Sequence, residues 1–278
     1  MAKILIVGLG DLGGRLATTL VADGHEVWGL RRSKAELPGV HVLQADITQV
    51  ETLMPPPALD YVFVILTPGE STDEAYERIY VTGTRNLLTK LDTSCLKRLF
   101  FVSSTSVYAQ DHGEWVDENS PAEPQGFSGK RLLEAENLLR NQIFPVTIAR
   151  FAGIYGPGRL RLLKWVESGR TVQSDPPAWT NRIHIEDCVR FLNFLMAQDV
   201  QSRTLEALYI GVDDEPVPQH EVLDWLAQEM ELPRPPRDNS NAVSQNKRLS
   251  NARSRELGFR FLYPDFRSGY RSVIKNTD

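Results

Sequence analysis

The sequence predicts an α/β protein with a doubly wound parallel sheet and a smaller C-terminal lobe. Three observations lead to this fold class. Short apolar runs alternate with helix-period segments over the first 150 residues, a glycine-rich turn joins the first run to the first helix, and the alternation ends after Arg150. Apolar runs of this length, separated by helices, are typical of parallel strands that are buried on both faces of a sheet.

The expected elements follow from the spacing of apolar residues. Leucines at 12, 16 and 20 form a stripe on one face of the first helix. Later helices are expected around 79–88, at 128–142 and at 185–198. Strands are expected at six places that share a run of four to six mainly apolar residues: 3–7, 26–30, 41–44, 61–66, 98–103 and 145–150. Six strands within 150 residues make one doubly wound domain.

Beyond the last expected strand, the elements become shorter and are separated by Gly156-Pro157-Gly158, Pro176-Pro177 and other breaks. We therefore expect a nucleotide-binding domain over residues 1–155 and a smaller lobe over 156–278. Doubly wound folds bind ligands at the carboxyl ends of their strands, which is where such a lobe would add substrate-binding residues. The helix at 185–198 is expected to pack back on the first domain.

Composition excludes several classes of protein. Acidic residues (36) exceed basic ones (31), and no run of Lys or Arg is longer than two, so nucleic acid is not the expected partner. The two cysteines, Cys95 and Cys188, are far apart and the five histidines lack ligand spacing, so no metal site is expected. No apolar stretch approaches the roughly 20 residues of a membrane span. We expect a soluble, cytoplasmic protein.

A dinucleotide-binding loop is predicted where the first strand meets the first helix, at Gly8-Leu9-Gly10-Asp11-Leu12-Gly13. The first glycine permits a tight turn, the second lets the backbone approach a pyrophosphate, and the third allows close packing of helix and strand. The helix N-terminus adds free N–H groups for the phosphates. This is the Rossmann-type arrangement for NAD or NADP; the alternative is that the glycines serve only a turn.

The end of the second strand indicates which cofactor is bound. An acidic residue that binds the adenosine ribose normally stands there, but this chain has Arg31 and Arg32. Arginines suit a 2′-phosphate by charge and by bidentate hydrogen bonding, so NADP(H) is favoured over NAD(H). The alternative is a pair of solvated surface arginines. Further cofactor contacts are expected from the ends of the third and fourth strands, at Asp46-Ile47 and Leu66-Thr67, although Asp46 would also serve as a loop cap.

These motifs resemble the extended short-chain dehydrogenase/reductase superfamily, in its NAD-dependent epimerase/dehydratase branch. The resemblance covers essentially the whole chain. Its matching segments, in order, are the glycine loop, Ala45-Asp46-Ile47, Gly83-Thr84-Arg-Asn86-Leu87-Leu88, Phe101-Val-Ser103-Ser104-Thr-Ser-Val-Tyr108, 150–158, Arg182-Ile-His184-Ile-Glu-Asp187, Asn246-Lys247-Arg248-Leu-Ser-Asn251 and Glu256-Leu-Gly258-Phe.

The resemblance implies a catalytic Ser or Thr after the fifth strand and a Tyr-x-x-x-Lys pair on the next helix. In such a pair the lysine lowers the tyrosine pKa and the tyrosine exchanges a proton with the substrate while hydride moves to or from the nicotinamide. Ser104 matches the hydroxyl and Lys130 the lysine, which also contacts the cofactor. The tyrosine position is Gly126, so the active site is atypical.

Two other family positions also differ. Tyr80 replaces an asparagine before Val-x-Gly-Thr, and Gly153 replaces the asparagine that helps to bind the substrate diphosphate. A general acid or base contributes about 100- to 10,000-fold, so hydride transfer does not strictly require the missing tyrosine. Another group would then supply the proton, and the candidates are Ser104, Tyr80, Tyr108, Tyr155 and His184. Tyr108 and Tyr155 are also compatible with packing around the pocket, and His184 with a loop role.

Substrate residues are expected in the C-terminal lobe. Several arginines with an aromatic residue would suit an anionic, nucleotide-like ligand. The candidates are Ser104, Tyr155, Arg159, Arg161, Trp179, Arg182, His184 and Lys247-Arg248, with scattered surface arginines as the alternative. The leading hypothesis is an NAD(P)-dependent oxidoreductase or epimerase/dehydratase for a small hydroxylated, carbonyl or nucleotide-sugar-like substrate. The alternative is a catalytically silent NAD(P)-binding sensor. Members of the family often dimerise through the helices after the fourth and fifth strands, so a homodimer is compatible with the resemblance.

Overall fold

The computed structural model describes residues 1–240 and 246–275, and the chain divides into two compact units. Unit 1 comprises Met1–Val107, Ala122–Arg150 and Val189–Tyr209. Unit 2 comprises Tyr108–Pro121, Phe151–Cys188 and Ile210–Asp278. Each unit is thus assembled from segments that are distant in the sequence. The segment 108–121, expected in the nucleotide-binding domain, belongs to unit 2, and α6 (Ile185–Val200) belongs to unit 1 from Val189 onward.

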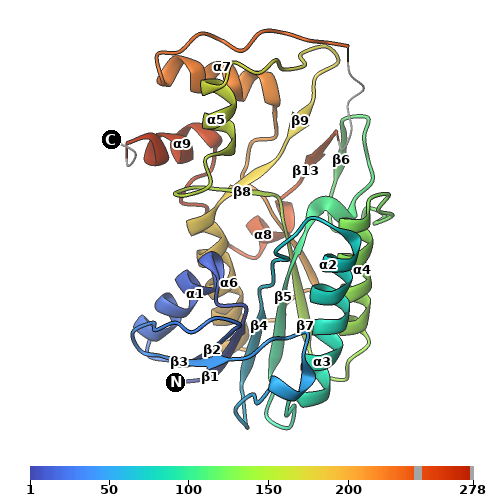
Figure 1. The fold of residues 1–278 in the computed structure, drawn as a ribbon, viewed down its shortest axis with the longest axis vertical. Coiled ribbons are helices and arrows are strands. Elements are labelled where there is room, and N and C mark those ends of the chain that lie inside the picture. Colours follow the sequence, from blue (N-terminus) through green and yellow to red (C-terminus); the bar gives the residue numbers. More distant parts are fainter. Residues whose placement is uncertain (241–245, 276–278) are drawn as a thin grey trace. The chain divides into compact units, whose positions relative to one another are not determined.

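Unit 1 is organised around a seven-stranded sheet with the order β11-β7-β5-β4-β1-β2-β3 (Figure 1). Its strands are β1 (Lys3–Val7), β2 (Glu26–Arg31), β3 (Val40–Gln44), β4 (Tyr61–Val64), β5 (Arg98–Ser104), β7 (Val146–Phe151) and β11 (Leu208–Gly211). The central strand β1 runs parallel to both neighbours, with Ile4 opposite Val27 on one side and Tyr61 on the other. The predicted α/β fold class is confirmed, and all six expected strands are present.

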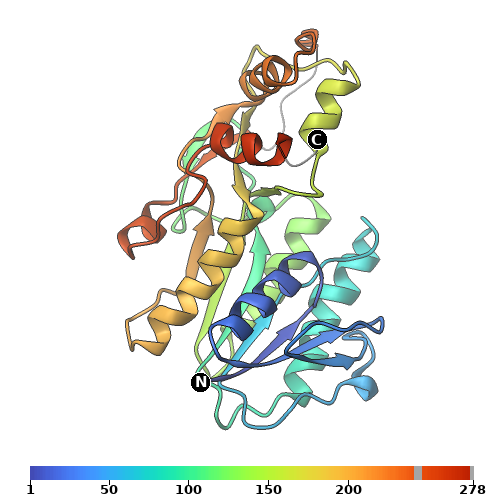
Figure 2. The same cartoon turned by 90° about the vertical axis from the view of Figure 1, so that its left-hand side faces the viewer.

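Helices cover both faces of this sheet, which is why β4 is buried at every residue. On one face lie α1 (Asp11–Ala22) and α6, and on the other lie α2 (Asp73–Tyr76), α3 (Gly83–Lys90) and α4 (Phe127–Arg140), as Figures 1 and 2 show. The leucine stripe of α1 is buried as expected. The strand order reverses between β2 and β4 on either side of β1, and in doubly wound sheets the ligand crevice lies at such a reversal.

The helix between β4 and β5 is interrupted by a π-helical turn, Glu77–Thr82, which joins α2 to α3. The Thr82 hydroxyl donates a hydrogen bond of 3.0 Å to the Glu77 carboxylate. These two side chains are five residues apart, which is the spacing of one π turn. The turn contains Tyr80, which is buried. π turns of this kind are frequent at functional sites.

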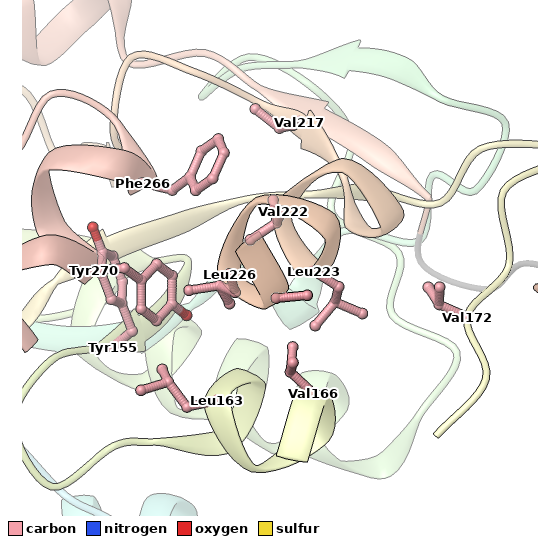
Figure 3. Close-up of a cluster of buried hydrophobic side chains, with 11 residues drawn as sticks. Tyr155, Leu163, Val166, Val172, Val217, Val222, Leu223, Leu226, Phe266 and Tyr270 are labelled. Atoms are coloured by element: carbon pink, nitrogen blue, oxygen red, sulfur yellow. The ribbon is translucent and has the colours of Figure 1, made fainter. Parts of the chain in front are cut away.

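Unit 2 has short strand pairs and helices. The paired strands are β8 (Gly153–Tyr155) with β10 (Arg182–His184), β9 (Trp179–Thr180) with β12 (Val217–Pro218), and β6 (Glu114–Val116) with β13 (Lys247–Leu249). The helices are α5 (Arg161–Glu167), α7 (Gln219–Glu229), α8 (Ala252–Glu256) and α9 (Phe266–Ile274). Figure 3 shows its core, where Val166 of α5, Leu223 and Leu226 of α7 and Phe266 of α9 come together.

Among the described residues, no helix is both long enough and apolar enough to cross a membrane.

Candidate functional site

The glycine loop of unit 1 has the geometry that the sequence predicts for a dinucleotide loop. Gly8 has φ +100°, and a Cβ atom there would lie 2.0 Å from the Ile65 carbonyl oxygen. A Cβ atom at Gly13 would lie 2.2 Å from the Gly8 carbonyl oxygen. No residue with a side chain fits either position without displacing backbone. By contrast, a Cβ atom at Gly10 would meet no heavy atom within 4 Å, so the fold leaves open space at this glycine.

The N–H groups of Gly8 and Leu9 both donate to the Leu30 carbonyl, at 3.0 and 3.1 Å, which fixes the glycine loop to the end of β2. Gly10 is the N-cap of α1 and Asp11 lies in its first turn. The Asp11 carboxylate pairs with Arg15 one turn later at 2.8 Å. The N–H groups at the start of a helix have no acceptor within the helix, so the first turn of α1, directly after the loop, offers donors to an anion.

A pocket of about 200 Å³ opens in unit 1 beside this loop. It is lined by residues from the carboxyl ends of four neighbouring strands and from the π turn: Gly8, Leu9, Gly10, Leu30, Arg31, Arg32, Ser33, Ala45, Ile47, Leu66, Thr67 and Ile79. The structure therefore brings together seven of the predicted cofactor residues, namely Gly8, Gly10, Arg31, Arg32, Ile47, Leu66 and Thr67. Leu12 and Gly13 are buried in α1 behind the loop rather than in the pocket lining.

The charge of this pocket comes from arginine alone. Its lining includes Arg31 and Arg32 but no Asp or Glu. The Arg31 guanidinium donates a hydrogen bond of 2.8 Å to the Ser33 hydroxyl. A guanidinium and a hydroxyl side by side at the end of β2 provide charge and several donors for a phosphate group.

Asp46 has a local partner in the structure. One oxygen of its carboxylate accepts hydrogen bonds from the Thr48 N–H at 2.9 Å and from the Thr48 hydroxyl at 2.8 Å. This is the loop-capping arrangement that was the alternative interpretation of this residue. Its neighbours Ala45 and Ile47 line the pocket, whereas Asp46 is absent from the lining. Its predicted contact with the adenine stays a prediction.

The residues at the family's catalytic positions lie around the start of α4. Ser104 ends β5, and its hydroxyl accepts a hydrogen bond of 3.2 Å from the Ser106 N–H. Gly126 is the N-cap of α4, with φ −80°; it is exposed, and a Cβ atom there would meet no heavy atom within 4 Å. Gly129, one turn later, is packed tightly, because a Cβ atom there would lie 2.4 Å from the Ser106 carbonyl oxygen.

Lys130 is exposed, and it lines a shallow groove on unit 1 rather than the pocket beside the glycine loop. This groove of about 450 Å³ is also lined by Ala122, Glu123, Pro124, Gln125, Leu133, Glu134 and Asn137. The next residue, Arg131, forms a bidentate ion pair with Asp73 of α2, at 2.7 and 2.9 Å. The hydrogen bonds from Arg131 lower the pKa of Asp73, and the positive charge of Lys130 adds to this effect.

Tyr80 is oriented by contacts that occupy its hydroxyl. The phenol donates a hydrogen bond of 3.1 Å to the carbonyl oxygen of Leu66, one of the pocket residues. Burial raises the pKa of Tyr80 well above its ordinary value. A buried phenol that already donates to a backbone carbonyl is a poor source of a proton for a substrate. Tyr80, which stands where the family has an asparagine, thus uses its hydroxyl to contact the backbone of Leu66.

Apart from Ser104, which belongs to unit 1, the predicted substrate residues belong to unit 2, as does Tyr108. Tyr155 and Arg182 lie in the core of this unit, 4% and 3% exposed. Tyr155 stacks on Tyr270 with ring centroids 4.4 Å apart, and Arg182 lies over the Phe266 ring at 5.3 Å and donates to the Thr180 hydroxyl. Burial raises the pKa of Tyr155 above its ordinary range. Their contacts are those of packing residues.

The remaining candidates of unit 2 are distributed over several places. His184 is buried and lies edge-on to Tyr155, with ring centroids 5.2 Å apart. Arg159 and Arg161 are exposed. The guanidinium of Arg248 lies between two indoles, 5.0 Å from the Trp179 ring and 5.2 Å from the Trp115 ring. Lys247 is buried and donates to the Tyr108 carbonyl at 3.0 Å, and this burial lowers the pKa of its ammonium.

Sequence reasoning did not identify several residues of the pocket, namely Leu9, Leu30, Ser33, Ala45 and Ile79. Four of them are direct neighbours of residues that were predicted, so extending each motif by one residue would have found them. Ile79 lies in the π turn, and its apolar spacing predicted only a helical face. The partner of Tyr80 carries no local sequence signal, because Leu66 is fourteen residues away and contributes its backbone.

Comparison with known proteins agrees with this geometry. The model of the NAD dependent epimerase/dehydratase family matches residues 4–211. Protein YeeZ of Escherichia coli K12 is 30% identical over 282 residues, which cover 95% of this chain and 97% of that protein. This relative is therefore similar over its whole length.

Solved structures show the same fold. A Methylobacillus flagellatus protein assigned to the NAD-dependent epimerase/dehydratase group superposes with a TM-score of 0.83 at 40% identity, covering 99% of this chain and 98% of that chain. MoeE5 in complex with UDP-glucose and NAD superposes with a TM-score of 0.80 at 22% identity, covering 99% of this chain and 98% of that one. At 22% identity, the similarity to MoeE5 shows a common fold and nothing more.

Proposed function

The chain belongs to the NAD-dependent epimerase/dehydratase family, and on this premise we propose that it binds NADP(H) in the unit 1 pocket and transfers hydride to or from a hydroxyl or carbonyl substrate. The reaction is then an oxidation, a reduction, or a redox-cycling epimerisation or dehydration. When bound, the dinucleotide supplies the hydride. Nucleotide-sugar-like compounds are the first substrates to test, because the related fold of MoeE5 is described in complex with UDP-glucose.

One observation carries the cofactor assignment. The pocket that contains the glycine loop is lined by Arg31, Arg32 and Ser33 and by no carboxylate. A carboxylate at the end of β2 would accept hydrogen bonds from a free ribose 2′-hydroxyl and would repel a 2′-phosphate. Guanidinium groups do the opposite, because they donate to phosphate oxygens with charge assistance. The chemistry of the donor set therefore fits NADP(H) better than NAD(H).

Isothermal titration calorimetry with NADPH and NADH tests this assignment. We expect NADPH to bind at least about tenfold more tightly than NADH, since a charge-assisted hydrogen bond contributes about 1.5–3 kcal/mol. Arg31→Ala is expected to remove most of this preference while leaving NADH affinity nearly unchanged. Arg85→Ala, on α3 and absent from the pocket lining, removes the same charge and serves as the control. Equal affinities for NADPH and NADH in the unmutated protein would contradict the NADP(H) assignment.

The proposed reaction also requires a group that donates a proton to the substrate or accepts one from it. Gly126 provides no side chain, and the Tyr80 phenol is held by Leu66, so Ser104 is the hydroxyl of unit 1 that we assign to this role. Ser104→Ala is expected to lower the rate of hydride transfer by about 100-fold or more with little change in NADPH affinity. The measurement is NADPH absorbance at 340 nm during reaction with a panel of ketones and UDP-sugars.

The alternative function is a catalytically silent NADP(H)-binding protein. The absence of a phenol at position 126 is the observation that favours it. Such a protein would show the same NADPH affinity and the same effect of Arg31→Ala. It would give no change at 340 nm with any member of the substrate panel, in either direction of the reaction. The binding and absorbance experiments together separate the two functions.

A further inference from the structure

Tyr80 is held rigidly inside unit 1. Its side chain is 7% exposed, and its ring makes an edge contact with Phe101 of β5 at 6.5 Å and a tilted contact with Tyr76 at 5.4 Å between centroids. The backbone around it is the π turn, which the hydrogen bond between Thr82 and Glu77 spans from end to end. The direction of the phenol is therefore set by packing on two sides and by an unusual helical turn.

The phenol acts on the segment that follows β4, which we call the β4 loop (Ile65–Thr67). The β4 loop has no helix or strand of its own, so its backbone depends on hydrogen bonds from outside. Within the part of the chain that the structure describes there are two: the Ile65 N–H donates to the Val7 carbonyl at 2.8 Å, and the Leu66 carbonyl accepts from Tyr80 at 3.1 Å. Tyr80 is thus the side-chain anchor of this loop.

The β4 loop forms one wall of the proposed cofactor pocket and touches the adjacent glycine loop. Leu66 and Thr67 are lining residues. The Ile65 carbonyl oxygen lies so close to Gly8 that a Cβ atom at that glycine would be 2.0 Å away. A shift of the β4 loop by even a fraction of an ångström would therefore change its contact with the glycine loop and the width of the pocket.

We propose that Tyr80 is a positioning residue of the dinucleotide site, which sets cofactor affinity by holding the Leu66 carbonyl and with it the β4 loop against the glycine loop. This inference rests on the proposed function of the pocket. Without the phenol, the half-buried Leu66 carbonyl lacks its side-chain donor, and the loop moves to reach water or another partner. This wall of the pocket is then no longer held in its binding conformation. Ordering the β4 loop reduces the free energy of cofactor binding, so the affinity falls.

The test is Tyr80→Phe, which keeps the ring and removes only the hydroxyl. NADPH and NADH are titrated by calorimetry, and melting temperatures are recorded with and without NADPH. We expect Tyr80→Phe to weaken both dinucleotides by the same factor, about five- to tenfold, because the hydrogen bond acts on the loop and not on the 2′-phosphate. This equal loss differs from that of Arg31→Ala, which changes the ratio of the two affinities.

Tyr76→Phe is the matched control. Tyr76 lies one turn before Tyr80 on the same helix, and within the described residues its hydroxyl makes no hydrogen bond. We expect its cofactor affinities to equal those of the unmutated protein. The melting temperatures distinguish positioning from simple stability, because a positioning role reduces the NADPH-induced rise in melting temperature, whereas a purely structural role lowers the melting temperature of the free protein and leaves that rise intact.

Unchanged affinities in Tyr80→Phe, with a lower melting temperature or without one, would overturn the inference while leaving the proposed function standing. If the unmutated protein binds neither NADPH nor NADH, the proposed function fails, and the inference fails with it. Only a loss of affinity in Tyr80→Phe that Tyr76→Phe does not share supports the positioning role.

Discussion

Glu136 and Arg150 form a buried ion pair in which the two carboxylate oxygens lie 2.9 Å from Nε and 2.6 Å from Nη2 of the guanidinium. The side chains are 0% and 3% exposed. The same carboxylate accepts a hydrogen bond of 2.6 Å from the Ser103 hydroxyl. Because Glu136 belongs to α4, Arg150 to β7 and Ser103 to β5, one carboxylate joins three elements next to Ser104.

We expect Glu136→Gln to lower the free energy of unfolding by about 3–5 kcal/mol, because the substitution removes the negative charge that pairs with the buried Arg150 guanidinium. The measurement is urea denaturation followed by far-UV circular dichroism, with the two-state assumption checked by a second probe.

Arg140→Ala is the control for this pair. Arg140 contacts the same carboxylate at 3.4 Å, but its side chain is 36% exposed. Exposed ion pairs contribute about 0–1 kcal/mol, and because the Arg140 end of this contact reaches solvent, this variant should lose much less stability than Glu136→Gln. Equal losses in the two variants would show that burial of the Glu136–Arg150 pair does not determine its contribution.

Structural features that depend on neighbouring residues in the sequence could be predicted. Those that depend on contacts between distant residues could not. The strand ending at Val7, the glycine loop and the arginines after β2 are all local patterns, and the structure places Gly8 and Arg31 in one pocket. β11 was missed, because it lies beyond Arg150, where the alternation of strands and helices that predicted the other strands of the sheet ends. The sequence likewise contains no sign that Glu136 of α4 is buried, since its partner Arg150 lies on the strand β7.

Residue roles carried over by position were the least predictable part of the site. Tyr80 was considered as a proton donor because of its place in a motif, yet its hydroxyl contacts a backbone carbonyl fourteen residues away. Lys130 matches the family lysine, but the direction of its side chain depends on how α4 is rotated, which no spacing rule specifies.

Gly10 provides a test that separates folding from cofactor binding. Its backbone is in the extended region and a Cβ atom there meets no protein atom, so Gly10→Ala should leave the stability of the free protein nearly unchanged. A close approach of the pyrophosphate to the backbone at this position would be blocked by the new methyl group. We expect NADPH affinity to fall by about tenfold or more, measured by calorimetry.

Gly14→Ala is the matched substitution in the same segment. It also lies in open space, but inside α1, where alanine is favoured over glycine by about 0.5–1 kcal/mol. This variant should therefore gain stability and keep its NADPH affinity. If Gly10→Ala also keeps full affinity, the pyrophosphate does not approach at this glycine.

Two glycines at the start of α4 should respond differently to the addition of a methyl group. A Cβ atom at Gly129 would lie 2.4 Å from the Ser106 carbonyl oxygen and 2.6 Å from Cβ of Pro124. We expect Gly129→Ala to lower the free energy of unfolding by about 1–3 kcal/mol through this overlap, as measured by urea denaturation.

At Gly126 there is open space and an ordinary φ, so Gly126→Ala should change stability by less than about 1 kcal/mol. Gly126→Tyr should fold for the same reason, which makes it a suitable variant for returning a phenol to the family's position. A stability loss at Gly126 as large as that at Gly129 would contradict the packing described for the start of α4.

Asp213, a buried carboxylic acid of unit 2, should make the protein less stable as the pH rises. It is 1% exposed, and burial raises the pKa of its carboxyl well above the ordinary value of about 3.8, although the charge of Arg182 opposes this and those of Glu215 and Asp214 add to it. The unfolded chain ionises this carboxyl from about pH 4 upward and the folded chain only at a higher pH, so stability is lost as the pH rises above about 4.

Asp213→Asn removes this loss, and we therefore expect its melting temperature to exceed that of the unmutated protein at pH 7.5 by a margin that shrinks toward pH 4. Asp238→Asn is the control, because Asp238 is not fully buried and hydrogen bonds from Ser240 lower the pKa of its carboxyl. Because this pKa is lowered, ionisation of Asp238 stabilises the folded protein above about pH 4, which is the opposite of the effect at Asp213. Its substitution should therefore give no gain in melting temperature at pH 7.5. A gain for Asp213→Asn that is as large at pH 4 as at pH 7.5 would show that the amide improves packing and that ionisation of the carboxyl is not the cause.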